Sequence, residues 1–259
     1  MKEELFDLAV KAAKSAGEIT LNYFNKNIEI GYKGNLDNDL VTEVDRKSEK
    51  CIIDMIKDKY PEHIILAEES GLTGASSDVK WVIDPLDGTV NYAHGVPIFS
   101  VSIGVEVNGE IVVGVVFDPT RNELFTAKKG EGAFLNGKRI AVSNSTELSK
   151  SMLVTGFPYN VKENPFNCIE IFKNFLLSSR ALRRLGSAAL DASWVAASRF
   201  DGFYEVMLQP WDSAAGALLV TEAGGKTTSF SSDDFSIYEK GILFTNGKIH
   251  KQMQELLSR

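Results

Sequence analysis

The spacing of apolar residues changes along this chain, and that change constrains the fold more than any other feature. Near the N-terminus, apolar residues recur at helical spacing in two segments, residues 4–26 and 43–59. From Phe99 onward they alternate with other residues, and the hairpin dipeptide Asn108-Gly109 separates two alternating runs. The first half of the chain therefore predicts two helices packed on an antiparallel sheet.

The strands of this first half are short apolar runs bounded by turn residues. They are expected at residues 64–67, 80–84, 101–107, 111–117 and 123–127, and a second Asn-Gly pair follows at 136–137.

The second half has a different pattern, in which apolar runs alternate with helical segments, as in an α/β unit. The expected strands are Met152–Thr155, Ala181–Leu185, Phe203–Leu208 and Ile242–Thr245, and the expected helices cover residues 165–178, 187–198, 212–223 and 248–257. A polar stretch from Ser143 to Ser151 separates the two patterns. We therefore expect an N-terminal α+β domain of residues 1–145 and a C-terminal α/β domain of residues 146–259.

Composition is that of an ordinary globular protein, with 259 residues, 44% hydrophobic and 24% charged. A chain of this length buries roughly 70–75% of its unfolded surface, so it needs no disulfide to stay folded. The net charge of −7 offers no basic surface for nucleic acid or an anionic membrane. The N-terminus has acidic residues where a signal peptide would be basic, and Cys51 and Cys168 are widely spaced. We therefore expect reduced thiols and a cytoplasmic location.

Acidic side chains follow predicted strands or begin predicted helices, where a carboxylate is costly to desolvate unless it is paired or bound to metal. These residues are Asp45, Glu68, Asp84, Asp87 and Asp212. Oxygen ligands without a cluster of His and Cys residues favour Mg²⁺ or Mn²⁺ over zinc. The histidines show no metal-ligand spacing, and each is expected on the surface or in a loop: His63, His94 and His250.

The segment Asp84-Pro85-Leu86-Asp87-Gly88-Thr89 suits a turn that binds metal and phosphate. Pro85 is expected to stop the sheet ladder, and Gly88 lets the backbone approach a ligand. Thr89 can begin a short helix whose free amides attract phosphate. An Asx-type turn with a helix cap would explain the same residues. The carboxylates of Glu68 and Glu69 upstream and of Asp212 downstream favour the metal site over the simple turn.

Two further groups of polar residues remain open to more than one interpretation. Arg180, Arg183 and Arg184 form a basic run on a predicted strand, which suits either a solvated edge or dimer contact, or a contact to substrate phosphate. Glu205, also on a predicted strand, suits either a salt bridge or acceptance of a substrate hydroxyl. Trp194 and Phe203 are expected in the core.

Three motifs resemble those of the inositol monophosphatase family, and they occur in the family's order and at similar spacing. They are Glu68-Glu69-Ser70, then Trp81-Val82-Ile83-Asp84-Pro85-Leu86-Asp87-Gly88-Thr89-Val90-Asn91-Tyr92, then Trp211-Asp212-Ser213-Ala214-Ala215-Gly216. The segments 39–45 and 221–225 are also similar to the family, so the resemblance covers essentially the whole chain. It implies a layered α+β and α/β sandwich, the sugar-phosphatase fold of alternating helix and sheet layers. It also implies a lithium-sensitive, Mg²⁺-dependent phosphatase, usually a homodimer, in which Mn²⁺ can substitute.

The resemblance assigns roles to individual residues. It implies that Glu68, Asp84 and the carbonyl of Leu86 hold one metal, that Asp84, Asp87 and Asp212 hold a second, and that Glu68 helps to bind a third. Asp45 and Thr89 would orient or deprotonate the attacking water, and the amides of Gly88 and Thr89 would hold phosphate. The alcohol pocket would be lined by Asp87, Ser187, Ala188, Glu205 and Asp212.

The implied substrate is a small phosphomonoester, with inositol monophosphate the first candidate. Relatives that act on fructose 1,6-bisphosphate, NADP or adenosine 3′,5′-bisphosphate share the metal motif, which does not separate these substrates. Gln209-Pro210 replaces a His-containing pair of the animal members and weakens the expectation of strict inositol specificity. A non-catalytic metal-binding regulatory protein is a remote alternative, disfavoured because Glu68, Asp84, Asp87 and Asp212 are all present.

Overall fold

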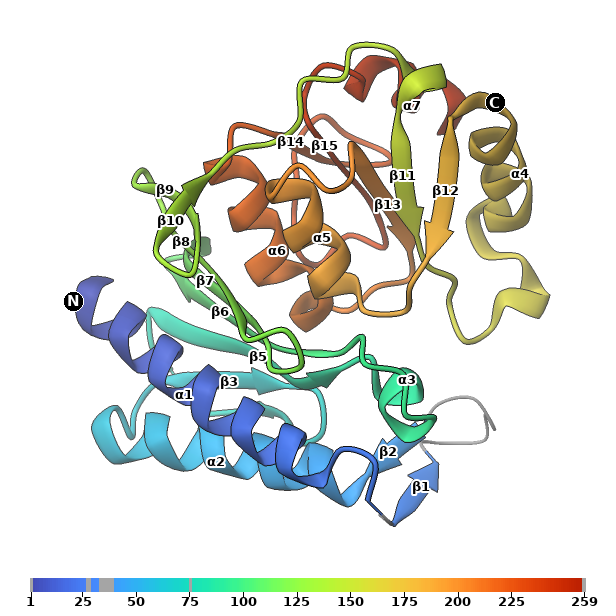
Figure 1. The fold of residues 1–259 in the computed structure, drawn as a ribbon. Helices are drawn as coiled ribbons and strands as arrows, with labels where there is room; N and C mark the ends of the chain where they lie inside the picture. The colour runs from blue at the N-terminus through green and yellow to red at the C-terminus, as the bar shows by residue number, and fades with distance from the viewer. Residues whose placement is uncertain (1, 27–28, 33–39, 75, 258–259) are drawn as a thin grey trace.

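The computed structural model describes residues 2–26, 29–32, 40–74 and 76–257 (Figure 1). Its helices are α1 (Lys2–Tyr23), α2 (Glu43–Lys59), α3 (Thr89–Ala93), α4 (Cys168–Ser178), α5 (Ala188–Ala196), α6 (Pro210–Glu222) and α7 (His250–Leu257). Its strands are β1 (Ile30–Tyr32), β2 (Leu40–Thr42), β3 (Ile64–Ala67), β4 (Gly71–Thr73), β5 (Val79–Asp87), β6 (Ser100–Val107), β7 (Glu110–Asp118), β8 (Glu123–Lys128), β9 (Gly132–Leu135), β10 (Lys138–Ile140), β11 (Met152–Thr155), β12 (Ala181–Arg184), β13 (Gly202–Val206), β14 (Lys226–Ser229) and β15 (Gly241–Thr245). Asp39, within one of the segments that resemble the family, lies outside the described residues.

The elements form alternating layers of helix and sheet (Figure 1). Helices α1 and α2 cover one face of an eight-stranded sheet, and α5 and α6 lie between that sheet and a five-stranded one. Helices α4 and α7 cover the outer face of the second sheet. The layered fold implied by the family resemblance is therefore confirmed.

The strand directions depart from the prediction in the first sheet. Its order is β10-β9-β8-β7-β6-β5-β3-β4, and its pairs are antiparallel except for β3 with β5, which is parallel. The prediction of a wholly antiparallel sheet was wrong at this pair. The chain reverses at β4, which pairs with one side of β3, and reverses again to bring β5 to the other side. Hydrophobic alternation carries no information about strand direction.

The five-stranded sheet has the order β12-β11-β13-β15-β14. Strand β11 runs parallel to both β12 and β13, while β15 runs antiparallel to β13 and β14. Parallel neighbours need a crossover connection. Helix α4 provides it between β11 and β12, and α5 lies between β12 and β13 in the chain. The carboxyl ends of β11, β12 and β13 therefore face the same edge of the sheet.

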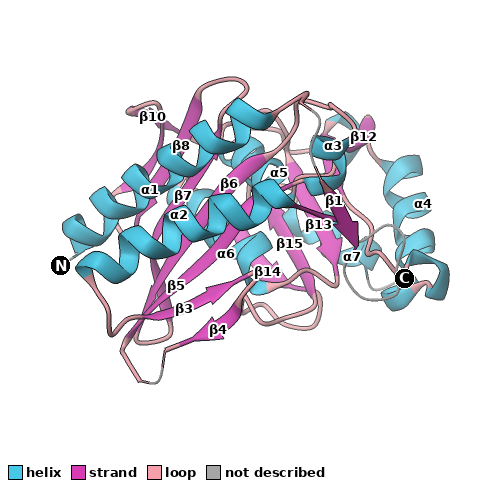
Figure 2. Ribbon diagram, turned by 90° about the horizontal axis from the view of Figure 1, so that it is seen from below, coloured by secondary structure: helices cyan, strands magenta, loops and turns pink. Residues whose placement is uncertain are grey.

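Helices α1 and α2 form where amphipathic spacing predicted them, although α1 ends at Tyr23 rather than at residue 26. Figure 2 shows the two helices side by side across the sheet. The buried face of α1 is rich in small residues that allow close packing: Ala9, Ala12 and Ala16. Helix α2 contributes the larger Ile52 and Ile56, and complete burial of such a side chain stabilises the fold by roughly 1.5–3 kcal/mol.

Helices α5 and α6 are apolar on nearly all sides because a sheet lies on each side of them. Every residue of α5 is buried. Helix α6 lies so close to the first sheet that a Cβ at Gly104 would be 2.8 Å from the Ala214 Cβ. A Cβ at Gly114 would likewise be 2.8 Å from the Ala215 carbonyl oxygen. This close approach fixes the N-terminus of α6, which carries Asp212, against the first sheet.

Strand β5 is longer than predicted and continues past Pro85 to Asp87. Its register with β6 shifts between Asp84, opposite Ser102, and Asp87, opposite Ser100. Pro85 lacks an N–H and interrupts the ladder, but pairing resumes beyond it as in a β-bulge. The bulge lets Asp84 and Asp87 lie near the same site although they are three positions apart.

Two of the three histidines, His63 and His250, are buried. His63 lies in the bend between α2 and β3, as predicted for a loop residue, whereas His250 begins α7, so its predicted position on the surface or in a loop was wrong. His63 accepts a hydrogen bond at Nδ1 from Trp81 Nε1 at 3.1 Å and stacks on Tyr60. His250 lies between the Thr228 and Thr245 hydroxyls, 3.1 and 2.9 Å from its ring nitrogens. Both rings have polar partners within the fold, which makes burial of a neutral imidazole acceptable.

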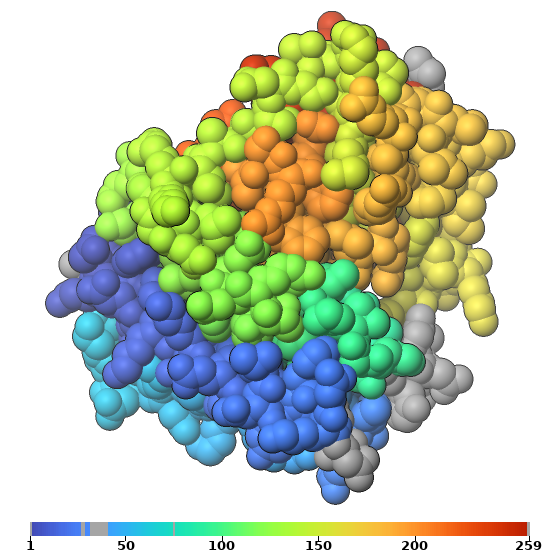
Figure 3. Space-filling model, viewed as in Figure 1, coloured from blue at the N-terminus to red at the C-terminus, as the bar shows by residue number. Residues whose placement is uncertain are grey.

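The hydrophobic core crosses the expected boundary between residues 145 and 146. One buried cluster contains Val116 and Phe125 from the first half together with Val154, Leu190 and Phe203 from the second. Trp194 is also in this cluster, so the core positions predicted for Trp194 and Phe203 are confirmed. Figure 3 shows the two halves in contact on the visible face. None of the helices in the described ranges is long and apolar enough to cross a membrane.

Candidate active site

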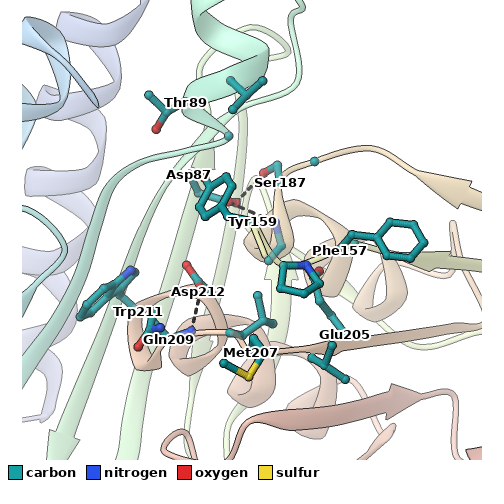
Figure 4. A pocket seen from close by; sticks show the side chains of 18 of the residues that line it. Asp87, Thr89, Phe157, Tyr159, Ser187, Glu205, Met207, Gln209, Trp211 and Asp212 are labelled. Atoms are coloured by element: carbon teal, nitrogen blue, oxygen red, sulfur yellow. Dashed lines mark hydrogen bonds between the residues drawn. The ribbon is translucent and has the colours of Figure 1, made fainter. Parts of the chain in front are cut away.

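A cavity of about 630 Å³ lies between the end of β5, the N-termini of α5 and α6, and the ends of β11 and β13 (Figure 4). It brings together most of the predicted site residues: Glu68, Asp87, Gly88, Thr89, Ser187, Ala188, Glu205 and Asp212. Asp45, Asp84 and Leu86 are not part of the lining. They contact or interact electrostatically with residues that are.

Gly88 joins the two halves of the molecule at this cavity. Its φ of +95° lies in the left-handed region that favours glycine. A Cβ there would be 2.9 Å from the Ile98 carbonyl oxygen and 3.1 Å from the Gly186 carbonyl oxygen. The turn before α3 can therefore approach the turn before α5 only because residue 88 has no side chain.

Thr89 and Asp45 form a hydrogen-bonded pair at the back of the cavity. Thr89 Oγ1 lies 3.0 Å from Asp45 Oδ1 and 3.1 Å from the Leu86 carbonyl oxygen. The other oxygen of Asp45 accepts from the Thr42 amide at 2.8 Å, within the capping box of α2. Burial raises the pKa of Asp45, although these hydrogen bonds oppose the shift. The arrangement can orient the Thr89 hydroxyl and accept its proton.

Asp87 is held by the first turn of α5. Its carboxylate accepts hydrogen bonds from the Ala188 and Ala189 amides at 3.1 and 2.9 Å. The Ser187 and Ser100 hydroxyls donate to the same group at 2.5 and 3.2 Å. Burial raises its pKa while these donors lower it. A carboxylate at a helix N-terminus is stabilised by the free amides and the helix dipole, so Asp87 links the first sheet to α5.

Asp84 is buried and is repelled by the other predicted metal ligands. Its side chain is 2% exposed, and Oδ1 accepts from the Leu86 amide at 3.0 Å. Burial, followed by repulsion from Glu68, Asp87 and Asp212, raises its pKa well above the usual range. The pKa of Asp212 is also raised well above the usual range, mainly by burial. The Gln209 amide, which donates to Asp212 Oδ2 at 2.7 Å, opposes this shift. The four carboxylates thus interact strongly enough to oppose one another's ionisation.

The donor set suits a hard divalent cation. It consists of carboxylate and carbonyl oxygens, and of the described residues that line the cavity only Arg184 is cationic. Over the described ranges, no three His, Cys, Asp or Glu side chains lie close enough, as they stand, to hold one metal ion. The hydrogen bonds of Asp87 to α5 direct its carboxylate toward that helix. The residues fit such an ion by chemistry and by location, and binding it would require these side chains to draw together.

The opposite side of the cavity carries Glu205 next to Phe157 and Met207 (Figure 4). Burial raises the pKa of Glu205 to about 8, with Arg184 opposing the shift and Asp87 adding to it. Arg184 lines the cavity, whereas the exposed Arg183 does not line it and donates to the Leu182 carbonyl at 3.1 Å. The two interpretations of the basic run therefore apply to different residues: a cavity contact suits Arg184, and a solvated edge suits Arg183.

Several lining residues were not predicted from the sequence. They are Val90, Gly156, Phe157, Pro158, Tyr159, Asn160, Gly186, Val206, Met207, Leu208, Gln209 and Trp211. Most lie just after β11 or β13, at the carboxyl ends of parallel strands. Ligands commonly bind at such ends in α/β sheets, so the predicted strand ends at Thr155 and Leu208 were a usable signal.

Comparison with known proteins agrees with this geometry. The family model described as the inositol monophosphatase family matches residues 1–259. The chain is 46% identical over 252 residues to Nus factor SuhB of Escherichia coli K12, covering 96% of this chain and 94% of that protein. An inositol monophosphatase structure from Anabaena (Nostoc) sp. PCC 7120 has a TM-score of 0.88 at 41% identity, covering 99% of this chain and 96% of that one. The extragenic suppressor protein suhB of Bartonella henselae has a TM-score of 0.92 at 38% identity, covering 99% of each. This chain therefore belongs to the inositol monophosphatase family.

Proposed function

We propose that this protein hydrolyses small phosphate monoesters with the help of Mg²⁺, and that inositol monophosphate is the first substrate to test. One observation carries the proposal. Glu68, Asp84, Asp87 and Asp212 come from separate parts of the chain and repel one another beside the Gly88-Thr89 turn. A divalent cation would relieve that repulsion, and phosphate would bring its own negative charge to the same place.

Mg²⁺-dependent hydrolysis of a phosphate monoester requires a site that can hold divalent cations. Hydrolysis of a phosphate monoester needs a barrier reduction of roughly 20 kcal/mol or more. Bound Mg²⁺ would lower the pKa of the attacking water and stabilise the charge on the leaving oxygen. Mn²⁺ can replace it because both ions accept carboxylate oxygen ligands.

The metal-holding residues divide into sets that share members. Glu68, Asp84 and the Leu86 carbonyl would hold one ion, and Asp84, Asp87 and Asp212 a second, with Glu68 also contributing to a third. Because Asp84 belongs to two sets, it is the residue on which the proposal depends most.

The remaining residues position the reactants. Asp45 accepts the Thr89 hydrogen bond at 3.0 Å, so the pair can hold a water and receive its proton. The amides of Gly88 and Thr89 begin α3 and would bind phosphate oxygens. Ser187 and Ala188 hold Asp87 in place through hydrogen bonds while also lining the alcohol side.

The alcohol side favours a polyol. Glu205 and Asp87 offer hydroxyl acceptors there, and the small residues Ser187 and Ala188 leave room for a ring. A site that hydrogen-bonds hydroxyls discriminates strongly against analogues that lack them. Arg184 at the same cavity could pair with a second phosphate, so fructose 1,6-bisphosphate, NADP and adenosine 3′,5′-bisphosphate are the competing substrates.

Phosphate release from these four compounds, measured with Mg²⁺ and again with EDTA, tests the proposal. We expect release with Mg²⁺, none with EDTA, and the highest kcat/KM for inositol monophosphate. A preference of more than about tenfold for another compound would replace inositol phosphate but keep the metal mechanism. Failure to release phosphate from any of the four at saturating Mg²⁺ would contradict the enzymatic proposal.

A second candidate is a non-catalytic metal-binding role, favoured by the name Nus factor that the Escherichia coli relative carries. The same assay separates the two. Stabilisation by Mg²⁺ without release of phosphate from any compound would favour the non-catalytic role.

The family resemblance adds three expectations. We propose that the protein is a homodimer, that lithium ions inhibit it, and that it resides in the cytoplasm. Analytical ultracentrifugation, a lithium titration of the Mg²⁺-dependent rate and cell fractionation test them in turn.

A further inference from the structure

Gly156 and Glu205 occupy neighbouring positions on the alcohol side of the cavity. Gly156 directly follows β11, and Glu205 lies on β13, which pairs with β11 in parallel. A Cβ at Gly156 would lie 2.0 Å from one Glu205 carboxylate oxygen and 2.3 Å from the other. It would also lie 2.3 Å from the carboxyl carbon. The Glu205 carboxylate therefore fills the space that a side chain at residue 156 would need.

Backbone conformation does not explain this glycine. Its φ lies outside the left-handed region, unlike that of Gly88 or Gly186. The φ of Gly156 therefore does not require glycine. Of the described residues, Glu205 alone supplies the three atoms nearest to the missing Cβ.

Surrounding charges also act on the Glu205 carboxylate. Arg184 attracts it, and Asp87 repels it. The buried Asp191 on α5 interacts unfavourably with Glu205, and its Oδ1 has no hydrogen-bond partner among the described residues. Among the described residues, none donates a hydrogen bond to the Glu205 carboxylate itself. Its oxygens thus remain available as acceptors for a substrate hydroxyl.

We propose that Gly156 is a specificity-determining positioning residue: its missing side chain seats the Glu205 carboxylate where it accepts a hydroxyl of a polyol phosphate. This inference rests on the proposed function and names a determinant of its alcohol subsite. Gly156 itself makes no bond to substrate. It acts through the space that it leaves for Glu205.

A double-mutant cycle tests the inference. Gly156→Ala should displace the carboxylate and raise KM for inositol monophosphate about tenfold, the scale of one lost hydrogen bond, with little change in kcat. In a Glu205→Ala background, the same substitution should change KM by less than about twofold, because the group that it displaces is gone. KM for p-nitrophenyl phosphate, which offers no ring hydroxyls, should stay constant throughout.

Gly31→Ala is the matched control, since a Cβ at Gly31 would meet Val41 Cγ1 at an ordinary 3.4 Å and Gly31 does not line the cavity. It should leave both KM values unchanged. The inference is overturned if Gly156→Ala leaves KM for inositol monophosphate unchanged. It is also overturned if the variant raises KM equally in both backgrounds, or raises KM equally for both substrates.

Thermal unfolding provides a readout that does not need activity. If Gly156→Ala lowers the melting temperature, Glu205→Ala in the same chain should restore it, because the steric conflict involves that carboxylate. A double variant that stays as unstable as Gly156→Ala would also overturn the inference. If the wild-type protein releases no phosphate at all, the proposed function fails, while the thermal cycle still reports on the contact between Gly156 and Glu205.

Discussion

Asp84 and Asp87 lie three positions apart in β5 but have different environments. Asp87 is surrounded by donors from α5 and from two serines, which satisfy its charge. Asp84 accepts from the Leu86 amide and is hydrogen-bonded to Glu68, and it is repelled by three carboxylates. The two residues therefore differ in what a cation would do for them. A cation would add to an existing network of donors at Asp87, and at Asp84 it would relieve repulsion from neighbouring carboxylates.

Asp84→Asn should abolish most activity because it keeps the side-chain shape and removes a charge proposed to serve two metals. We expect kcat to fall by at least about 10³-fold in a phosphate-release assay at saturating Mg²⁺. Asp54→Asn, at an exposed position of α2, is the control and should keep full activity. Retention of more than about a tenth of wild-type turnover would show that Asp84 does not have this role.

Glu205 makes stability depend on pH. Its pKa rises from an ordinary 4.5 to about 8 on folding. Between these values the folded protein keeps a proton that the unfolded chain releases, so stability falls as pH rises through this window and levels off above it. The metal-free protein should therefore melt at a lower temperature at pH about 8 than at pH about 5.

Glu205→Gln isolates this contribution, because the amide cannot titrate. The difference in melting temperature between the two pH values should shrink in the variant. An unchanged difference would mean that Glu205 is ionised alike in the folded and unfolded chains.

Three helix N-termini lie beside acidic residues of the site. Asp45 is the third residue of α2, Asp212 the third residue of α6, and Asp87 accepts from the first turn of α5. Carboxylates gain from the free amides and partial positive charge at such ends. The helices thus offset part of the repulsion among the acids before any cation binds, and their placement matters as much as the acidic residues themselves.

Thr42→Ala tests this arrangement at α2. It removes the N-cap and one of the donors that hold Asp45, so the free energy of unfolding in urea should fall by about 1 kcal/mol or more. Lys50→Ala on the same helix breaks only an exposed ion pair and should change stability by less than about 0.5 kcal/mol. Equal effects of the two substitutions would contradict a special role for the cap.

The cavity exists only because both halves of the chain contribute to it. Glu68 to Val90 come from the first half, and Gly156 to Asp212 come from the second. The core is shared as well, since one buried cluster contains residues of both halves. The metal ligands proposed here therefore assemble only in the folded molecule, and any ion that they bind should favour folding.

Mg²⁺ should consequently stabilise the protein. At about 100 times its dissociation constant it contributes roughly 2.7 kcal/mol. For a chain of this length, that corresponds to a rise in melting temperature of roughly 5–10 °C, measured by calorimetry against metal-free protein. A potassium salt at matched ionic strength is the control, and Asp84→Asn should show a smaller rise. A melting curve that does not respond to Mg²⁺ would argue against a metal site.

Local sequence determined much of the secondary structure and the chemistry of the site. Helix α2 formed at the predicted residues, and the hairpin turned at Asn108-Gly109, because helical spacing and turn dipeptides act between near neighbours. The motifs around Asp84 and Asp212 identified the family for the same reason: their residues are close in sequence.

Only the tertiary structure decided how distant segments meet. It made β3 and β5 parallel, buried His63 and His250, and directed the Asp87 carboxylate toward α5. It also placed Gly156 against Glu205, although the two residues are 49 positions apart and no sequence motif contains both. Such contacts depend on which layers pack together and how closely. Periodicity along the chain reports which face of an element is buried, and carries no record of what is packed against it.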